Sequence, residues 1–231
     1  MESPDASKAL TGFAHAGLLI GNTMRAYTFG GYGQRTAEYG FYFRSPGTST
    51  ARGSVAAGLE GGPERGLQWD ASISIGRSTQ DYFIYNTVNA SYGPYTPTSF
   101  RPRGYMQQEA EATVVMSYPV VVSALSLPLH AAWGATWRNE TLESRPGNLE
   151  SYNPGPYADQ GFSVGSNGYQ GLNPAFAGRW SRPAVALYVD VEADITARWV
   201  VDVAARYENY YTSFGSTLTG KVAACTGHRT G

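Results

Sequence analysis

Three segments decide the fold: RPAVALYVDVEADIT (182–196), RWVVDVAARYENY (198–210) and STLTGKVAA (216–224). In the first, apolar residues occupy every second position from Val185 to Ile195, and the positions between them include Asp190, Glu192 and Asp194. A pleated strand sends successive side chains to opposite faces, so this period of two indicates a strand. The other two segments alternate in the same way. Together they predict three antiparallel strands with one apolar face and one charged face.

The same alternation recurs toward the amino terminus. We predict further strands over about 7–17, 23–35, 54–61, 67–77, 105–118 and 127–140. Short connections at 18–22, 61–66, 119–126 and 196–198 alternate with longer ones at 44–52, 81–104 and 141–181. Membrane barrels have short turns on one side and long loops on the other. The expected fold is therefore all-β, an antiparallel transmembrane β-barrel segment of about nine strands.

Periodicity does not by itself separate a membrane barrel from a soluble sandwich. A sandwich buries its apolar positions between two sheets, whereas a barrel turns them toward lipid and its charges toward the lumen. The aromatic residues near strand ends resemble the girdles of membrane proteins. They are Trp69, Trp133, Trp137, Trp199, Tyr207 and Tyr210.

The composition fits a turn-rich β protein and excludes several other classes. The 231 residues include 17 Tyr and 28 Gly, and only 15% are charged. The net charge of -1 gives no reason to expect a nucleic-acid partner. Cys225 is the single cysteine, which excludes an internal disulfide framework. No apolar run reaches the roughly 20 residues of a membrane-spanning helix.

The segments Ser181–Thr196, Val203–Tyr210 and Phe214–Ala224 resemble the barrel region of TonB-dependent outer-membrane receptors. The resemblance continues in the right order back to about Pro4, and it covers barrel only. It implies part of a 22-stranded type of barrel that is plugged by a separate domain. It also implies the outer membrane and its lipid as surroundings, the TonB energy-coupling system as a partner of the whole receptor, and an unidentified small-molecule ligand such as a siderophore, vitamin or saccharide.

Both ends of the sequence lead us to expect a fragment of a longer receptor. Met1–Asp5 has no basic segment followed by an apolar one, so no signal peptide is expected in this sequence. Alternation stops after Ala224. We therefore expect a partial receptor-like barrel domain over 1–224 and a non-strand tail over 225–231, as a truncated or frame-shifted gene would give.

The charged positions of the predicted strands are expected to face the barrel lumen, because a polar interior is usual for this architecture. The three carboxylates of the 182–196 segment would then pair with Arg198, Arg206 and Lys221. Alternate residues on one strand are about 6.5–7 Å apart, too far to chelate one ion alone. The full set is Asp70, Glu109, Glu111, Arg138, Asp190, Glu192, Asp194, Arg198, Asp202, Arg206, Glu208 and Lys221.

The aromatic and basic residues of the long connections are the candidates for ligand binding, since loops on a rigid scaffold commonly carry recognition. Packing within the loops or anchoring at the membrane interface would explain the same residues. The candidates are Tyr82, Tyr85, Tyr92, Tyr95, Arg101, Arg103, Tyr152, Tyr157 and Tyr169.

No motif indicates catalysis, a metal or a cofactor. His15, His130 and His228 have no second ligand at zinc spacing. No serine occupies a nucleophile elbow, and no phosphate-binding loop precedes a helix. We therefore expect no enzyme. Two alternatives to the receptor remain, a complete small outer-membrane barrel with a structural or adhesive role and a soluble extracellular β-sandwich that binds carbohydrate.

Overall fold

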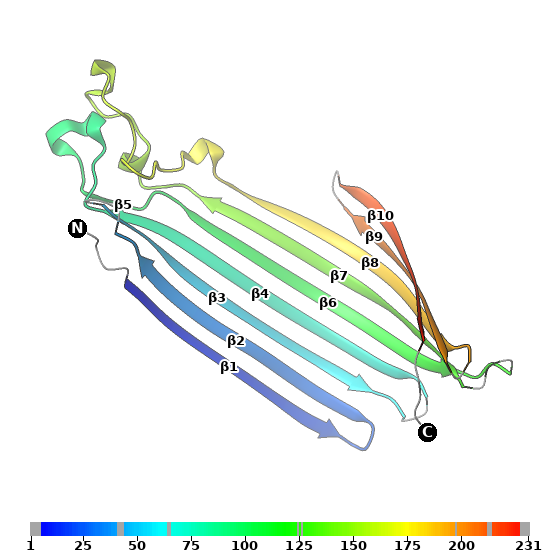
Figure 1. Ribbon diagram of the computed structural model, residues 1–231. Coiled ribbons are helices and arrows are strands. Elements are labelled where there is room, and N and C mark those ends of the chain that lie inside the picture. Colours follow the sequence, from blue (N-terminus) through cyan, green and yellow to red (C-terminus); the bar gives the residue numbers. More distant parts are fainter. Residues whose placement is uncertain are drawn as a thin grey trace.

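The computed structural model describes residues 6–40, 44–63, 66–123, 125, 127–196, 198–211 and 214–226. These residues form one ten-stranded sheet (Figure 1). Among these described residues, no helix is long and apolar enough to cross a membrane. The elements are β1 (Ala6–Ile20), β2 (Met24–Glu38), β3 (Ser45–Gly61), β4 (Gln68–Tyr85), η1 (Ala90–Tyr95), β5 (Ser99–Phe100), β6 (Gly104–Val120), β7 (Leu129–Arg145), η2 (Leu149–Ser151), η3 (Ala158–Gln160), η4 (Pro174–Phe176), β8 (Gly178–Asp194), β9 (Trp199–Tyr210) and β10 (Gly215–Thr226).

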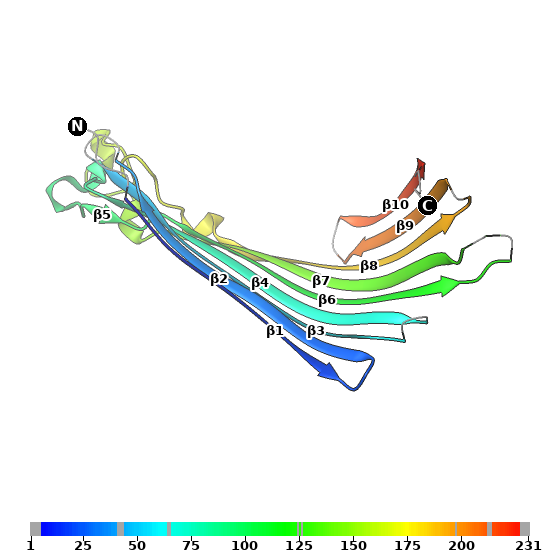
Figure 2. The ribbon, with the colours of Figure 1, turned by 60° about the horizontal axis from the view of Figure 1, so that its bottom comes forward.

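The sheet is an antiparallel meander in the order β1-β2-β3-β4-β6-β7-β8-β9-β10, and the two-residue β5 pairs with β4 beside this path. The prediction of about nine strands is confirmed for the long ones. Within the described residues the sheet is open, because β1 and β10 each pair with one neighbour only. Figure 2 shows a single curved layer, so the second layer that a sandwich needs is not found in this part of the chain.

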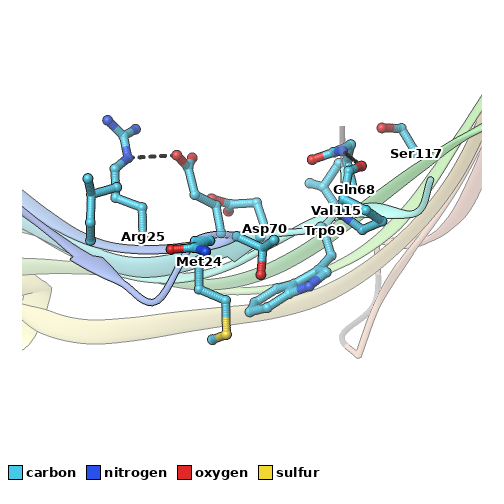
Figure 3. A pocket seen from close by; sticks show the side chains of 14 residues that line it. Met24, Arg25, Gln68, Trp69, Asp70, Val115 and Ser117 are labelled. Atoms are coloured by element: carbon cyan, nitrogen blue, oxygen red, sulfur yellow. Dashed lines mark hydrogen bonds and ion pairs between the residues drawn. The ribbon is translucent and has the colours of Figure 1, made fainter. Parts of the chain in front are cut away.

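The register divides the side chains between two faces, because directly paired residues point to the same side. Arg25 pairs with Glu60, and Glu60 pairs with Asp70, which places these three charges together. Met24 and Trp69 both pair with Gly61 on the other side. Figure 3 shows the ion pair of Arg25 pointing away from the side chains of Met24 and Trp69.

We call the face with Asp70 and Glu208 the inner face and the face with Ile73 and Leu187 the outer face. On the inner face, Ala186 is only 2% exposed, because longer side chains from the neighbouring strands cover it. On the outer face, Ile73 is 65% exposed and Leu187 is 53% exposed. A face of large, exposed apolar side chains is what a lipid-facing barrel wall requires. The predicted division into an apolar and a charged face is confirmed.

The strands extend further toward the long loops than the sequence predicted. Residues 44–52 were predicted to form a loop, but 45–52 belong to β3. All of them pair with β4, and 47–52 also pair with β2. Likewise β4 continues to Tyr85 and β7 to Arg145, so the long loops are 86–103 and 146–177. We call them the first and the second long loop. In these extensions both faces carry polar residues, so the alternation that marks a strand is missing.

The opposite ends of the strands also needed correction. β1 runs to Ile20, and the turn that follows begins at Gly21 with a φ of 64°, which suits glycine. β10 ends at Thr226, where Cys225 pairs with Val200, so strand pairing continues two residues past the predicted boundary at Ala224. Residues 227–231 of the predicted tail lie outside the described residues.

Two glycines of the inner face are covered by a tyrosine from the neighbouring strand. A Cβ atom on Gly58 would lie 2.5 Å from the ring of Tyr27, and one on Gly134 would lie 2.6 Å from the ring of Tyr188. The Tyr27 hydroxyl passes over β3 and donates a hydrogen bond of 2.7 Å to Asp70 on β4. The missing side chains thus let aromatic rings cross the sheet and pack flat on it.

Candidate functional site

Three tyrosines and one arginine meet on the inner face where the sheet joins the long loops. Tyr82 lies near the end of β4, and Tyr105 lies at the start of β6. The ring of Tyr169, from the second long loop, stacks on Tyr82 with ring centres 5.2 Å apart. Tyr105 meets Tyr82 edge to face at 6.1 Å. The guanidinium carbon of Arg103 lies 4.8 Å from the centre of the Tyr169 ring. We call these four residues the tyrosine cluster.

Arg103 is held in place by the second long loop and by β4. Its Nη2 donates a hydrogen bond of 2.8 Å to the carbonyl oxygen of Gln170, and its backbone carbonyl accepts one from the amide of Tyr82. Its Nε is buried and has no hydrogen-bond partner in the described part of the chain. Burial raises the pKa of Tyr169 above its usual value, and the charge of Arg103 opposes this rise. The phenol therefore stays neutral at physiological pH.

The two long loops are joined by a buried polar side chain. Asn89 is 0% exposed, and its amide nitrogen donates to the carbonyl oxygens of Glu150 at 2.7 Å and Asn153 at 3.1 Å. Its side-chain oxygen accepts from the backbone amide and from the hydroxyl of Ser91. Asn89 thus uses both of its side-chain donors and both of its acceptor positions. Satisfied buried networks of this kind hold one conformation.

Backbone contacts extend the junction between the loops. Arg101 and Asn148 exchange two hydrogen bonds, one from each backbone amide. The amide of Leu172 in the second loop donates to the carbonyl oxygen of Pro102 in the first. Within the second loop, Ser151 is fully buried, and its carbonyl oxygen accepts from the amides of Ser166 and Gly171. The loops therefore hold Tyr169 and Arg103 on a shared framework, next to Tyr82 and Tyr105 on the inner face of the sheet.

Only Tyr82, Arg103 and Tyr169 of the nine predicted loop residues come together. Tyr85 is on β4 and faces outward, and Tyr95 stands alone at 79% exposure. The remaining residues contribute to loop packing or lie at the surface. The ring of Tyr157 covers Gly93, Tyr92 packs on Gly155, Tyr152 is half-buried, and Arg101 is exposed. Tyr105 was missed, because its position in a regular strand gave no sign of a binding residue.

The predicted inner-face charges lie on one face of the sheet, apart from Arg198, which lies in the connection between β8 and β9. The ion pairs of Lys221 and Arg206 differ from the expected ones. Lys221 pairs with Asp202, and Arg206 lies 3.8 Å from Glu208. Arg138 reaches over β8 to bind Glu208 at 3.0 Å. This last contact covers Ala186, which explains the burial of so small a residue. The shared face of these charges is shown, but their exposure to a lumen stays a prediction.

Within the described residues, no group of three or more His, Cys, Asp or Glu side chains is arranged to hold a metal ion. His15 lies on β1 and His130 on β7, with other strands between them. His228 lies outside the described residues.

One known structure agrees with the fold described above. No curated protein sequence matches the chain. The siderophore receptor PiuA from Acinetobacter baumannii has a similar fold, with a TM-score of 0.55 and 10% identity over 95% of this chain and 39% of that one. This chain thus spans about two fifths of that receptor. The translocator domain of autotransporter NalP from Neisseria meningitidis has a TM-score of 0.44 and 10% identity over 95% of this chain and 70% of that one.

A family model provides the assignment that these fold similarities cannot. The model for the TonB dependent receptor-like beta-barrel matches residues 6–228, which is nearly the whole chain. The matched range runs from the start of β1 past the end of β10, and it includes both long loops and the tyrosine cluster. The chain therefore belongs to the TonB-dependent receptor-like β-barrel family.

Proposed function

We propose that this chain forms part of the barrel wall of a bacterial outer-membrane receptor, which takes up a small ligand with energy from the TonB system. The two-faced sheet is the observation that carries the proposal. Its outer face exposes Ile73, Leu187 and other large apolar side chains, whereas its inner face carries the ion pairs. In water such an outer face would aggregate, and in lipid it is stable.

The tyrosine cluster is the proposed point of ligand recognition. Arg103 supplies a fixed positive charge, and Tyr82 and Tyr169 supply flat aromatic surfaces. Aromatic faces and a guanidinium group bind planar or negatively charged ligands by stacking, cation–π contacts and charged hydrogen bonds. Siderophores and other ligands with acidic or aromatic groups fit this chemistry better than a neutral saccharide does.

The other two functions are less well supported. The single curved sheet and its exposed apolar face oppose the soluble carbohydrate-binding sandwich. A small barrel with an adhesive role would share the outer face, but it gives no reason for an arginine and three tyrosines to converge on the inner side. A ligand-binding measurement therefore separates the receptor from the adhesive barrel.

The proposal is tested by ligand binding to the chain refolded in detergent micelles, with intrinsic fluorescence as the readout. The panel contains ferric siderophores, cobalamin and oligosaccharides. We expect an acidic ligand to bind, and Arg103→Gln to weaken it about tenfold or more, as loss of a hydrogen-bonded charge of about 1.5–3 kcal/mol implies.

Arg101→Gln is the matched control, because Arg101 is an exposed arginine two residues away in the same loop. It should bind the ligand as the unchanged chain does. Equal losses in the two variants would mean that only the overall charge of the loop matters. Binding of no panel member would contradict the receptor proposal at this site.

A further inference from the structure

Charged residues on the outer face are confined to one end of the sheet. The register of the described strands places seven there, and all lie toward the long loops. No described strand carries an outward charge toward the short turns. The seven are Lys8, Glu38, Arg77, Asp81, Glu143, Arg145 and Arg179.

Arg77 is the first outward residue beyond the apolar positions of β4. The apolar series on that strand ends at Ile75, two residues before it. On β6 the corresponding first polar residue is Gln108, which pairs directly with Arg77. On β7 it is Asn139, which follows Trp137. Three polar side chains thus lie along the border of the apolar surface, on adjacent strands.

The charge of Arg77 is not balanced by a neighbour. Asp81 is paired with Arg145 at 2.9 Å, and Glu143 lies opposite Arg179 in the register. Arg77 itself is exposed and makes no ion pair or side-chain hydrogen bond with the described residues. Its direct register neighbours are Gly53 and Gln108, neither of which is charged. The ring of Tyr32, which pairs with Gly53 on the outer face, lies 3.5 Å from the Cβ position of that glycine and carries no charge.

We propose that Arg77, with Gln108 and Asn139 beside it, binds the phosphate of an anionic lipid headgroup in the leaflet on the long-loop side. The proposal rests on the membrane location proposed above. A guanidinium group presents parallel donors that match phosphate oxygens, and the amides of Gln108 and Asn139 add further donors. The lipid chains would lie along the apolar surface of Ile75 and Trp137, directly below the headgroup.

The test measures lipid retention by the whole chain in micelles, using native mass spectrometry with added phosphatidylglycerol or phosphatidylcholine. We expect the unchanged chain to retain phosphatidylglycerol preferentially. Arg77→Gln should weaken that retention about fivefold, since a basic residue near an anionic membrane surface contributes about 1 kcal/mol. Arg52→Gln is the matched control, because Arg52 is an exposed arginine next to Gly53 but faces inward.

Equal retention by Arg77→Gln and the unchanged chain would overturn the proposal, and so would an equal loss in Arg52→Gln. Displacement of the lipid by inorganic phosphate at equal concentration would show an anion site without lipid preference, which also overturns it. Quenching of Trp fluorescence by lipids with brominated chains reports insertion independently. If the Trp fluorescence is quenched but Arg77→Gln does not change lipid retention, only this inference fails. If the Trp fluorescence is not quenched, both this inference and the proposed function fail.

Discussion

The sheet and the pair of long loops are stabilised in opposite ways. In the sheet, neighbouring backbones bond to one another, and large apolar side chains such as Ile73 and Leu187 remain exposed. In the loops, the most deeply buried side chains are polar, with Asn89, Ser91 and Ser151 fully enclosed. The comparison indicates that the sheet depends on its surroundings for side-chain burial, whereas the loops carry their own core of hydrogen bonds.

The two regions should therefore respond differently to the same kind of change. A charge on the outer face should affect the whole sheet only when lipid is present. Loss of a hydrogen bond in the loops should act locally, with or without lipid. Ile73→Arg and Asn89→Ala test these two expectations, and Gly58→Ala adds a change of packing on the inner face with a smaller effect.

Ile73→Arg should have the largest effect. Arginine facing the middle of a bilayer destabilises a barrel by about 2–4 kcal/mol. Reversible unfolding in lipid vesicles by guanidinium chloride measures this free energy. Ser74→Arg is the control, since Ser74 is the next residue on β4 and faces inward. It should change the free energy of unfolding by less than about 0.5 kcal/mol. Equal effects of the two variants would show that the faces are not distinguished by lipid.

Asn89→Ala should open the loops and leave the sheet intact. It removes the donor to two carbonyl groups and the acceptor for Ser91, and an unsatisfied buried polar group costs about 1–3 kcal/mol. We expect hydrogen exchange to speed up in both long loops but not in β6 or β7. Asn153→Ala is the control, because the side chain of Asn153 bonds only to the adjacent Pro154. Faster exchange in one loop alone would argue against a shared framework.

Gly58→Ala should have the smallest effect, about 1 kcal/mol, at the low end of the penalty for overpacking. The new methyl group meets the Tyr27 ring, which must swing toward the open inner side and lose its hydrogen bond to Asp70. Gly12→Ala is the control, since nothing lies within 4 Å of its Cβ position. Urea unfolding in micelles measures both. A destabilised Gly12→Ala variant would indicate that loss of any strand glycine is harmful.

Much of the fold follows from the sequence where apolar and polar residues occupy opposite faces. The alternation around Trp69, Trp133 and Leu187 predicted strands because these three residues and the valines and isoleucines beside them face outward. The strand residues 45–52 were misassigned because Ser, Thr and Gly on both faces resemble a loop. Such residues form a strand when the neighbouring strands set the register, but their local sequence pattern does not indicate a strand.

The candidate site was less predictable. Tyr82, Arg103 and Tyr169 were expected as loop residues, but their stacking depends on the conformation of the second long loop. That conformation depends on Asn89, whose two side-chain donors bond to backbone carbonyls distant in sequence. A single asparagine among several in a polar loop carries no periodic signal. Its role appears only once the two loops are placed together.

The meander order also determines how the sheet can assemble. Each long strand pairs with the long strands directly before and after it in the chain. Pairings between near neighbours in sequence close small loops, which favours rapid folding. Even the second long loop delays its hairpin only modestly, since each doubling of loop length costs about 0.6 kcal/mol. Strands can therefore be added one at a time in the order of synthesis, and no strand has to wait for a distant partner.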